Sequence, residues 1–483
     1  MAKIHIIYFD VDTGYYPGFH HGIASLSACI KRSGHILTFQ HIFKKESPEA
    51  VANRALINNP DIIGFSVTTN QRKYLVEYSG VIRNRSSIIQ IAGGVHPTIA
   101  PIDVLNIDSI NGICIGEAEY ILVDLLNRID RKEDIYNVPG FWWKDKEGNI
   151  IKNEIPGLEE DVSMLPFPDY SIFNAKSIIE SSSGWVSMMV SRGCPYDCYY
   201  CCNHVLASVY PSKKNYLRLP DAEYAVSLIK NNLNYFEKFS KIRGIIFADD
   251  LLTYRKNWFI EFINKFDREI KLPFILNARV EHLTEDIIIA LKNSGCEMVQ
   301  LGIESGNEQI REKLLNRSIS NNQIIDTFNL LHKHRLRTFS YNIVGFPFET
   351  KKQMKETLNL NKIIKPDAGN VFFFYPYPGT KLYSICKENN LLLENSENFS
   401  GYFEGFAIKL TNCNIIDVFL IYNKLKLYLS SRIFVKNFGM FGEIISNIIY
   451  FMLSLYPSFF VKLITRNSLI KYKIRKIIYK FIS

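Results

Sequence analysis

Residues 191–203 read SRGCPYDCYYCCN, and three cysteines in this stretch have an informative spacing. Cys194, Cys198 and Cys201 follow the pattern C-x3-C-x2-C, which lets one short loop curl around a single cubane. All irons of a [4Fe-4S] cube are normally held by protein thiolates, so a loop with three cysteines leaves one iron open. The pattern therefore predicts an iron–sulfur cluster that also binds a small molecule.

Two other uses of these cysteines are disfavoured. A structural zinc site normally needs four protein ligands, and only His204 lies near enough to add one locally. Disulfides are disfavoured because the nine cysteines are an odd number, scattered through a long chain that opens with a strand rather than a secretory signal. Cys202 directly follows Cys201, so we expect its side chain to point away from the cube.

The spacing, with the aromatic residue Tyr200 before the third cysteine, resembles the radical S-adenosylmethionine (SAM) superfamily. The resemblance implies that the methionine part of SAM chelates the open iron through its amine and carboxylate. It also implies that an electron, delivered by an external donor such as flavodoxin or ferredoxin, cleaves SAM and releases a 5'-deoxyadenosyl radical. Such a radical removes hydrogen from unactivated carbon.

Length and composition indicate a globular, enzyme-sized protein. The 483 residues, 47% of them hydrophobic, suffice for about three domains with buried cores. The net charge is +9, and seven Lys and Arg with no Asp or Glu lie between Lys462 and the C-terminus. Because the basic excess is mostly confined to this tail, a nucleic-acid partner is not indicated. The missing signal peptide and the cluster together predict a cytoplasmic location.

Strand and helix patterns alternate through residues 1 to about 135. Strands are predicted at 4–9, 36–39, 62–67 and 88–92, and helices at 22–32, 48–57 and 71–82. This order predicts a doubly wound, Rossmann-like parallel sheet that binds its ligand at the carboxyl ends of the strands. Gly93 and Gly94 fall at such an end.

Four short runs in this region together resemble the cobalamin-binding domain found upstream of many radical SAM cores. They are Gly34-His35, PDIIGFS at 60–66, GGVHPT at 93–98 and IGEAE at 115–119. The resemblance implies that the nucleotide tail of cobalamin enters the sheet edge near four residues, Ser66, Thr68, Gly93 and Gly94. It also implies that Asn70, His96 and Glu117 line the corrin face or the domain junction.

The lower axial ligand of the cobalt stays open. Methionine-synthase-like cobalamin domains carry the motif D-x-H-x-x-G, which does not occur in this sequence. Alignment on Gly22 and Gly34 puts Phe19 where that histidine would stand, so we expect cobalamin to bind without a histidine ligand. His20 and His21 keep the alternative open, because a one-residue offset would bring either beneath the cobalt.

Residues 136–182 are predicted to form a linker with a small hairpin. A polar turn at 144–149 separates the apolar residues 138–143 from 150–151, and a proline-punctuated apolar segment follows at 161–170. We expect Trp142 and Trp143 to pack this connector.

Residues 183–400 are predicted to form the catalytic core. Six strands, expected at 185–190, 242–247, 274–278, 298–301, 338–344 and 370–374, alternate with helices. This order predicts a partial (β/α)6 barrel of the TIM type, with functional groups at the carboxyl ends of the strands.

Charged residues follow the second and third of these strands. Asp249 and Asp250 could hold the ammonium group of SAM, although paired aspartates equally cap helices. Arg279 could bind the SAM carboxylate or a substrate acid.

Three further residues are assigned to the SAM site by the resemblance. Glu304 stands in the run G-x-E-S-G, which belongs to the SAM site of the family. Gly345 would give clearance near the adenine, and Tyr200 would cover that ring by stacking.

Residues 401–483 are predicted to form a helical region of basic and apolar residues. The apolar stretch 444–456 is too short for a ~20-residue membrane span. Residues 459–482 mix aromatic, aliphatic and basic side chains, as an interfacial helix at the inner membrane surface would. The alternative is a helical appendage that covers the barrel or the substrate pocket.

These features predict a cobalamin-dependent radical SAM methyltransferase that acts on an unactivated carbon of a small-molecule or lipid-like substrate. Its cofactors would be a [4Fe-4S] cluster, SAM and cobalamin. One alternative is an oxidative cyclase or rearrangement enzyme with the same cofactors, and another is a cobalamin-binding or sensing protein without turnover. No local motif names the substrate.

Overall fold

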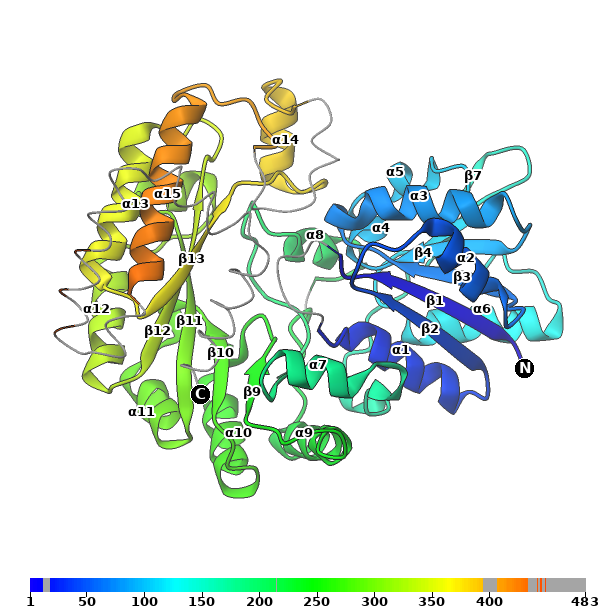
Figure 1. The fold of residues 1–483 in the computed structure, drawn as a ribbon, viewed down its shortest axis with the longest axis horizontal. Helices are drawn as coiled ribbons and strands as arrows, with labels where there is room; N and C mark the ends of the chain where they lie inside the picture. Colours follow the sequence, from blue (N-terminus) through cyan, green and yellow to red (C-terminus); the bar gives the residue numbers. More distant parts are fainter. Residues whose placement is uncertain are drawn as a thin grey trace.

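A computed structural model describes residues 1–11, 18–213, 215–393 and 406–432, together with 441, 444 and 448. Two α/β units lie side by side, each built on its own sheet (Figure 1). We call the seven-stranded N-terminal sheet, ordered β2-β1-β3-β4-β5-β6-β7, sheet A. The six-stranded sheet of the central region, ordered β13-β12-β11-β10-β9-β8, is sheet B.

Sheet A is a doubly wound sheet with an antiparallel edge. Its strands are β1 (Lys3–Phe9), β2 (Ile36–Ile42), β3 (Ile62–Ser66), β4 (Ile89–Gly93), β5 (Gly112–Cys114), β6 (Phe141–Lys144) and β7 (Ile150–Lys152). The first five strands pair in parallel, and β6 and β7 pair antiparallel. The predicted Rossmann-like sheet is therefore confirmed.

Helices cover both faces of sheet A. They are α1 (His21–Arg32), α2 (Pro48–Leu56), α3 (Arg72–Arg83), α4 (Val95–Ile99), α5 (Pro101–Leu105) and α6 (Glu119–Arg131). Side chains of β1 alternate between the faces, so that Ile4 and Ile6 pack in the layer of α1 and α6. Ile7 and Phe9 pack in the opposite layer with α2, α3 and α5.

The hairpin predicted in the linker forms, but it continues sheet A. Residues of β5 pair with β6, so that Gly112 stands opposite Trp143. Trp143 is buried and stacks on Phe141 at 5.2 Å between ring centroids. Strand β5 has only three residues, too few to show a strand pattern, so the pairing of the hairpin with sheet A was not predicted.

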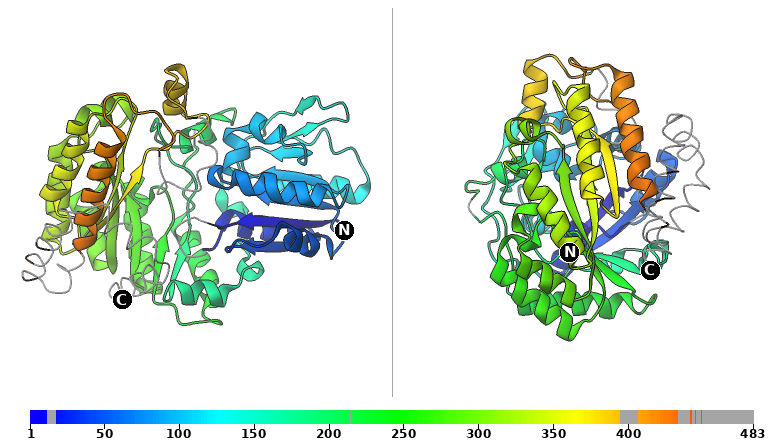
Figure 2. Two further views of the ribbon diagram at one scale, coloured as in Figure 1. Left: turned by 45° about the horizontal axis from the view of Figure 1, so that its top comes forward. Right: turned by 90° about the vertical axis from the view of Figure 1, so that its left-hand side faces the viewer.

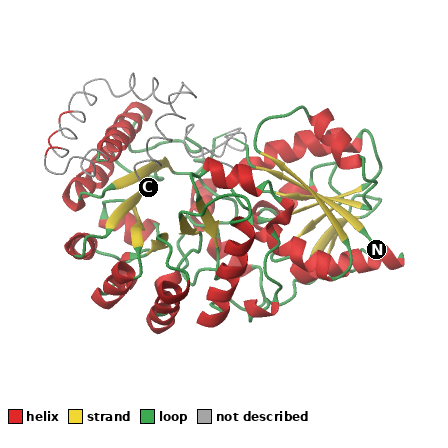
Figure 3. Ribbon diagram, turned by 60° about the horizontal axis from the view of Figure 1, so that its bottom comes forward, coloured by secondary structure: helices red, strands yellow, loops and turns green. Residues whose placement is uncertain are grey.

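Sheet B is an all-parallel half-barrel. Its strands are β8 (Trp185–Met188), β9 (Gly244–Phe247), β10 (Phe274–Ala278), β11 (Cys296–Glu304), β12 (Arg337–Val344) and β13 (Ala368–Phe373). Helices ranged along its outer side are α9 (Ala222–Phe236), α10 (Lys256–Glu269), α11 (Glu285–Asn293), α12 (Asn321–Lys333) and α13 (Lys351–Ile364) (Figure 3). The predicted partial (β/α)6 barrel is confirmed.

Shorter helices connect and close the two units. They are α7 (Ala175–Ser181), α8 (Asn203–Ser208) and α14 (Lys381–Glu388). One apolar core joins the units, because Phe173 of the connector and Phe236 of α9 belong to the same buried cluster as Ile4 of β1 and Leu301 of β11. The two sheets are thereby held in one packed body.

The described C-terminal part is helical. Helix α15 (Ile415–Ser431) packs on β13 beside α13 (Figure 2). The apolar stretch predicted at 444–456, apart from 444 and 448, and the basic segment predicted at 459–482 lie outside the described residues. No helix in the described part of the chain is long and apolar enough to cross a membrane.

A buried carboxyl group holds the turn between β12 and α13. Glu349 is 1% exposed, and its Oε2 accepts hydrogen bonds from the amides of Gly345, at 2.7 Å, and Phe346, at 3.1 Å. Its Oε1 is buried without a hydrogen-bond partner. Burial raises the pKa of Glu349 from 4.5 to about 8, which favours the protonated form in the folded chain.

This carboxyl group makes stability depend on pH. Between pH 4.5 and about 8 the folded chain holds a proton that the unfolded chain has released, so the free energy of unfolding decreases as pH rises. In Glu349→Gln we expect this decrease to be shallower by up to about 1.4 kcal/mol per pH unit. Urea unfolding of both proteins at several pH values measures how the free energy of unfolding changes with pH. The exposed Glu388→Gln should keep the wild-type slope, and an unchanged slope in Glu349→Gln would contradict the assignment.

Candidate active site

A cavity of about 370 Å³ lies between sheet A and the start of the cysteine loop. One wall is formed by sheet A with α1 and α6, and the other by residues 189–193 after β8 together with Asn203, Tyr216 and Asp250. The carboxyl ends of the sheet A strands and the cysteine loop therefore open into one space. This is where doubly wound sheets bind their ligands.

The part of the cavity next to sheet A is apolar and bordered by glycines. Ile6, Ile91 and Cys114 supply side chains there. Gly94 has φ +98°, and a Cβ atom at this position would lie 3.1 Å from the backbone nitrogen and oxygen of Val67. The apolar side chains suit an aromatic base, and the glycines let a bulky ligand come close to the backbone. The nucleotide tail of cobalamin requires both features.

The seven residues predicted to contact cobalamin divide into two groups. Ser66, Gly93, Gly94 and Glu117 line the cavity; Thr68, Asn70 and His96 do not. Thr68 stands at the start of a turn of 3-10 helix that includes Asn70, and its amide donates to Gln71 Oε1 at 3.3 Å. His96 is buried, and its Nε2 lies 2.9 Å from Asp103. For Thr68 and His96 these contacts indicate a structural role, whereas the Oδ1 of Asn70 is buried without a hydrogen-bond partner among the described residues.

Two residues near the expected position of a lower ligand already have protein partners. Phe19 is packed against another ring, and His21 is hydrogen-bonded. Phe19 stacks on Phe236 with 4.6 Å between ring centroids. The two ring nitrogens of His21 lie 2.8 Å from the hydroxyl of Tyr170 and 2.9 Å from that of Ser187. Burial lowers the pKa of His21 to about 3, so the ring is neutral.

His20 has one engaged nitrogen. Its Nδ1 accepts a hydrogen bond from the amide of Ile23 and caps α1. Its Nε2 lies 3.5 Å from Ser66 Oγ at the cavity wall, and burial lowers its pKa to about 4. His20 is therefore a neutral imidazole whose cavity-side nitrogen has only a long contact.

The cysteine loop begins with a close backbone approach. Gly193 has φ +83°, and a Cβ atom there would lie 2.2 Å from the carbonyl oxygen of Tyr216, so this position requires glycine. Arg279 donates to the Cys198 sulfur at 3.3 Å. Burial raises the pKa of Cys194 to about 12 and also raises that of Cys198. The pKa of Cys201 is raised chiefly by its hydrogen bond with Cys202.

The donor chemistry of the loop fits an iron–sulfur cluster. Cys194, Cys198 and Cys201 influence one another electrostatically, and the Arg279 guanidinium beside Cys198 favours a charged thiolate. The fit rests on the type and spacing of the donors, because within the described residues no group of three or more His, Cys, Asp and Glu side chains is gathered closely enough to hold a metal ion.

Asp249 and Asp250 have different surroundings. Oδ1 of Asp249 accepts hydrogen bonds from the amides of Val190, at 3.0 Å, and Ser191, at 2.5 Å, which fixes the chain just before the cysteine loop. Asp250 lines the cavity and is hydrogen-bonded to Asn203. Burial raises the pKa of both carboxyl groups, that of Asp249 to about 7. Of the two carboxyl groups, that of Asp250 is the one that lines the cavity.

Glu304 is paired with an arginine that no sequence pattern singled out. Its φ of +63° follows a register shift of β11, and its Oε1 accepts a hydrogen bond from Arg317 Nη1 at 3.0 Å. Arg317 also donates to the Tyr200 hydroxyl at 3.2 Å and to the Gly302 carbonyl at 3.0 Å. A single arginine in a polar loop carries no periodic or motif signal, so only the structure finds it.

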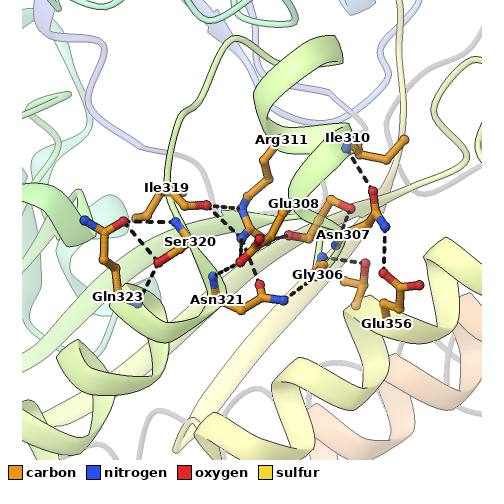
Figure 4. A network of polar contacts seen from close by, with 12 residues as sticks. Gly306, Asn307, Glu308, Ile310, Arg311, Ile319, Ser320, Asn321, Gln323 and Glu356 are labelled. Carbon is orange, nitrogen blue, oxygen red and sulfur yellow. Dashed lines mark hydrogen bonds and ion pairs between the residues drawn. The ribbon is translucent and has the colours of Figure 1, made fainter.

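A buried polar network supports this loop (Figure 4). Arg311 is fully buried and donates to the carbonyls of Ser305, at 2.6 Å, and Ile319, at 2.8 Å, and to Asn321 Oδ1, at 2.8 Å. These bonds close the segment between Glu304 and α12, which includes Arg317.

Two other residues assigned to the SAM site already have protein contacts. Arg279 lies over the ring of Tyr196, 3.6 Å from its centroid, and donates to Glu281 at 2.5 Å. Gly345 has φ +81°, and a Cβ atom there would lie 3.2 Å from the ring of Phe406. The space left by the missing side chain of Gly345 is therefore occupied by the ring of Phe406. The amide of Gly345 donates to Glu349.

Charged side chains connect the two units at the cavity. Arg192 of the cysteine loop donates to Glu117 at 2.9 Å and to Glu119 at 2.6 Å. Arg218 also donates to both carboxylate oxygens of Glu117. The arginines hold the pKa of Glu117 below its ordinary value despite burial. Glu117 was predicted at the corrin face or the domain junction, whereas neither Arg192 nor Arg218 was predicted as a partner of this carboxylate.

Comparison with known proteins bears on both units. The model of the radical SAM superfamily matches residues 188–360, and that of the B12 binding domain matches residues 9–126. An uncharacterized methyltransferase of Pyrococcus horikoshii is 24% identical over 90% of this chain and 93% of its own length. Bacteriochlorophyllide d C-12(1)-methyltransferase of Chlorobaculum tepidum is 23% identical over 68% of this chain and 66% of its own.

A solved structure has the same fold. The cobalamin-dependent SAM radical enzyme OxsB superimposes with a TM-score of 0.71 at 17% identity, covering 99% of this chain and 75% of that one. The matches confirm the fold class, the enzyme class and the cofactors predicted from the sequence. The chain belongs to the radical SAM superfamily and carries a B12 binding domain before its radical SAM domain.

Proposed function

We propose that this enzyme transfers a methyl group to an unactivated carbon of a small-molecule substrate. The observation that carries the proposal is the shared cavity, which is lined by Gly93 and Gly94 on the side of sheet A and by Gly193 and Asp250 on the side of the cysteine loop. A site of this kind brings two cofactors to one substrate while excluding water.

The cofactors supply the difficult chemistry and the chain positions them. When bound, the cluster and SAM supply a carbon-centred radical, and cobalamin supplies the methyl group. We assign cluster ligation to Cys194, Cys198 and Cys201. Asp249 would act indirectly, because its hydrogen bonds to residues 190 and 191 fix the chain that leads into the first cysteine.

SAM would be held by two groups on the core. Asp250 faces the cavity with its carboxyl group and suits the ammonium group of SAM. Glu304, Arg317 and Tyr200 form a hydrogen-bonded set next to the loop, in which Arg317 orients the ring of Tyr200. Such an oriented ring suits stacking on the adenine.

Cobalamin would be held without a protein imidazole on its lower face. Phe19 is packed against Phe236 and both nitrogens of His21 are hydrogen-bonded, which supports this proposal. His20 lines the cavity with an Nε2 that lies 3.5 Å from Ser66 Oγ, so it is the residue that would supply the alternative, a histidine ligand. Ser66, Gly93 and Gly94 would border the nucleotide tail of cobalamin.

Replacing each of the three ligand cysteines tests the cluster assignment. After anaerobic reconstitution, Cys194→Ala, Cys198→Ala and Cys201→Ala should each retain less than about a tenth of the wild-type iron and sulfide per chain, because a cubane needs all three thiolates. Cys202→Ala is the matched control and should retain the wild-type content. Loss of the cluster in Cys202→Ala with retention in Cys201→Ala would reassign the third ligand.

Isotope transfer tests the reaction. Reduced, reconstituted enzyme is incubated with methyl-deuterated SAM and a small-molecule extract of the organism that makes the protein. Methyl transfer predicts a deuterated product with S-adenosylhomocysteine and 5'-deoxyadenosine formed in equal amounts. Formation of 5'-deoxyadenosine without S-adenosylhomocysteine would indicate cyclisation or rearrangement instead. Formation of neither would indicate a binding protein without turnover.

We also propose that the enzyme acts in the cytoplasm and receives electrons from a donor such as flavodoxin or ferredoxin. We further propose that its C-terminal tail binds an anionic membrane surface. All nine cysteines are free thiols, which suits a reducing compartment. Helix α15 exposes apolar side chains on its surface, those of Ile416, which is 66% exposed, Phe419 and Leu420. Seven basic residues follow from Lys462 onward, and each contributes up to about 1 kcal/mol near anionic lipid.

Sedimentation with phosphatidylserine-containing vesicles tests the membrane proposal. The full chain should bind at low salt and be released as salt rises, because the attraction is electrostatic. A chain that ends at Tyr456 should stay in the supernatant, as should the full chain with neutral vesicles. Equal binding of the two chains would eliminate a role for the tail.

A further inference from the structure

The junction cluster, which we define as Glu117, Glu119, Arg192 and Arg218 with Ser25, links the two units by charge. Arg192 lies between the two carboxylates and also donates to Ser25 Oγ at 3.0 Å. Ser25 in turn donates to Glu119 at 2.8 Å. Both carboxylates come from the segment around the start of α6, and both guanidiniums come from the central region.

The charges of the junction cluster balance only when the two units are together. The N-terminal unit contributes two negative charges and the central unit two positive charges. The side chains of Arg218 and Glu119 are 2% and 8% exposed, so an unpaired charge there would be buried. Burial of an unpaired charge is strongly unfavourable, so the cluster favours the docked arrangement.

The junction cluster also fixes the start of the cysteine loop. Arg192 and Arg218 form an antiparallel bridge, with amide-to-carbonyl distances of 3.0 and 2.8 Å. Arg192 is followed by Gly193, which lies against the carbonyl of Tyr216, and then by Cys194. The side chain that is held by the two carboxylates is therefore two residues from the first cysteine.

Four of the five members of the junction cluster reach the cavity. They are Ser25, Glu117, Glu119 and Arg192, and they line it together with Gly93 and Gly94. A ligand that occupies this end of the cavity excludes water from the carboxylates and strengthens their interaction with Arg192. A ligand bound on the side of sheet A thus restricts the motion of Arg192, the residue that leads into the cysteine loop.

We propose that Glu117, Glu119, Arg192 and Arg218 are positioning residues that couple cobalamin binding to cluster binding. This inference rests on the proposed function only for the identity of the two cofactors. Each cofactor favours the arrangement in which the junction cluster is complete, so each increases affinity for the other. By linkage the two increases are equal.

Cobalamin affinity with and without the cluster measures the coupling. Hydroxocobalamin is titrated into cluster-free and cluster-loaded protein, and its absorbance change gives two dissociation constants. In the wild type we expect the loaded protein to bind at least about fivefold more tightly, the lower end of typical coupling. Glu119→Gln, which keeps the oxygen that Ser25 and Arg192 bind but removes the charge, should bring the ratio close to one.

The matched control is Asp169→Asn. Asp169 of the connector contacts Lys31 and Ser27 of α1, so this variant weakens the same junction without touching Arg192. It should keep the wild-type ratio. A wild-type ratio of one, or equal ratios in the wild type and Glu119→Gln, would overturn the proposal.

A charge-balanced variant covers the case in which Glu119→Gln does not fold. Glu117→Gln combined with Arg218→Gln removes one charge of each sign and should also lower the ratio, with folding checked by circular dichroism. The titration needs no substrate and no turnover. An enzyme that binds both cofactors with coupling but transfers no methyl group would therefore refute the proposed reaction and leave this inference standing.

Discussion

The arrangement of the site depends on ion pairs formed across the junction of the two units. Glu117 and Glu119 come from the B12 binding domain, and Arg192 and Arg218 come from the radical SAM side. Removing one partner of a buried pair commonly costs about 3–5 kcal/mol, because the other charge is left uncompensated. The shared apolar core brings the sheets together, and these pairs fix how the cysteine loop meets the cavity.

Polar residues near the cavity divide into those that build it and those that remain for ligands. Asp249 is saturated by backbone amides and Arg311 by backbone carbonyls and an asparagine, so both determine backbone geometry. Asp250 and Ser66 face the cavity. A motif identifies the neighbourhood of a site, whereas hydrogen-bond saturation shows which of its members a ligand can engage.

Periodic and motif signals predicted much of the fold and some of the site. Strands such as 274–278 and 338–344 were predicted within a residue of their observed ends, because aromatic and β-branched residues, which favour strands, are frequent in both. The three-residue strand β5 was missed because it is too short to show a pattern, and with it the pairing of the hairpin. Arg192, Arg218 and Arg317 were missed because their partners are distant in sequence or on irregular loops. The boundaries of the predicted domains remain predictions.

Residues at the carboxyl ends of sheet A and at the start of the cysteine loop line one cavity, so two cofactors held there would lie close enough to serve one substrate. Electron paramagnetic resonance tests it on protein that carries both the reduced cluster and cob(II)alamin. A shared cavity predicts a magnetic interaction between the two spins, seen as splitting or broadening that is absent from protein loaded with either cofactor alone. A spectrum equal to the sum of the two singly loaded spectra would contradict it.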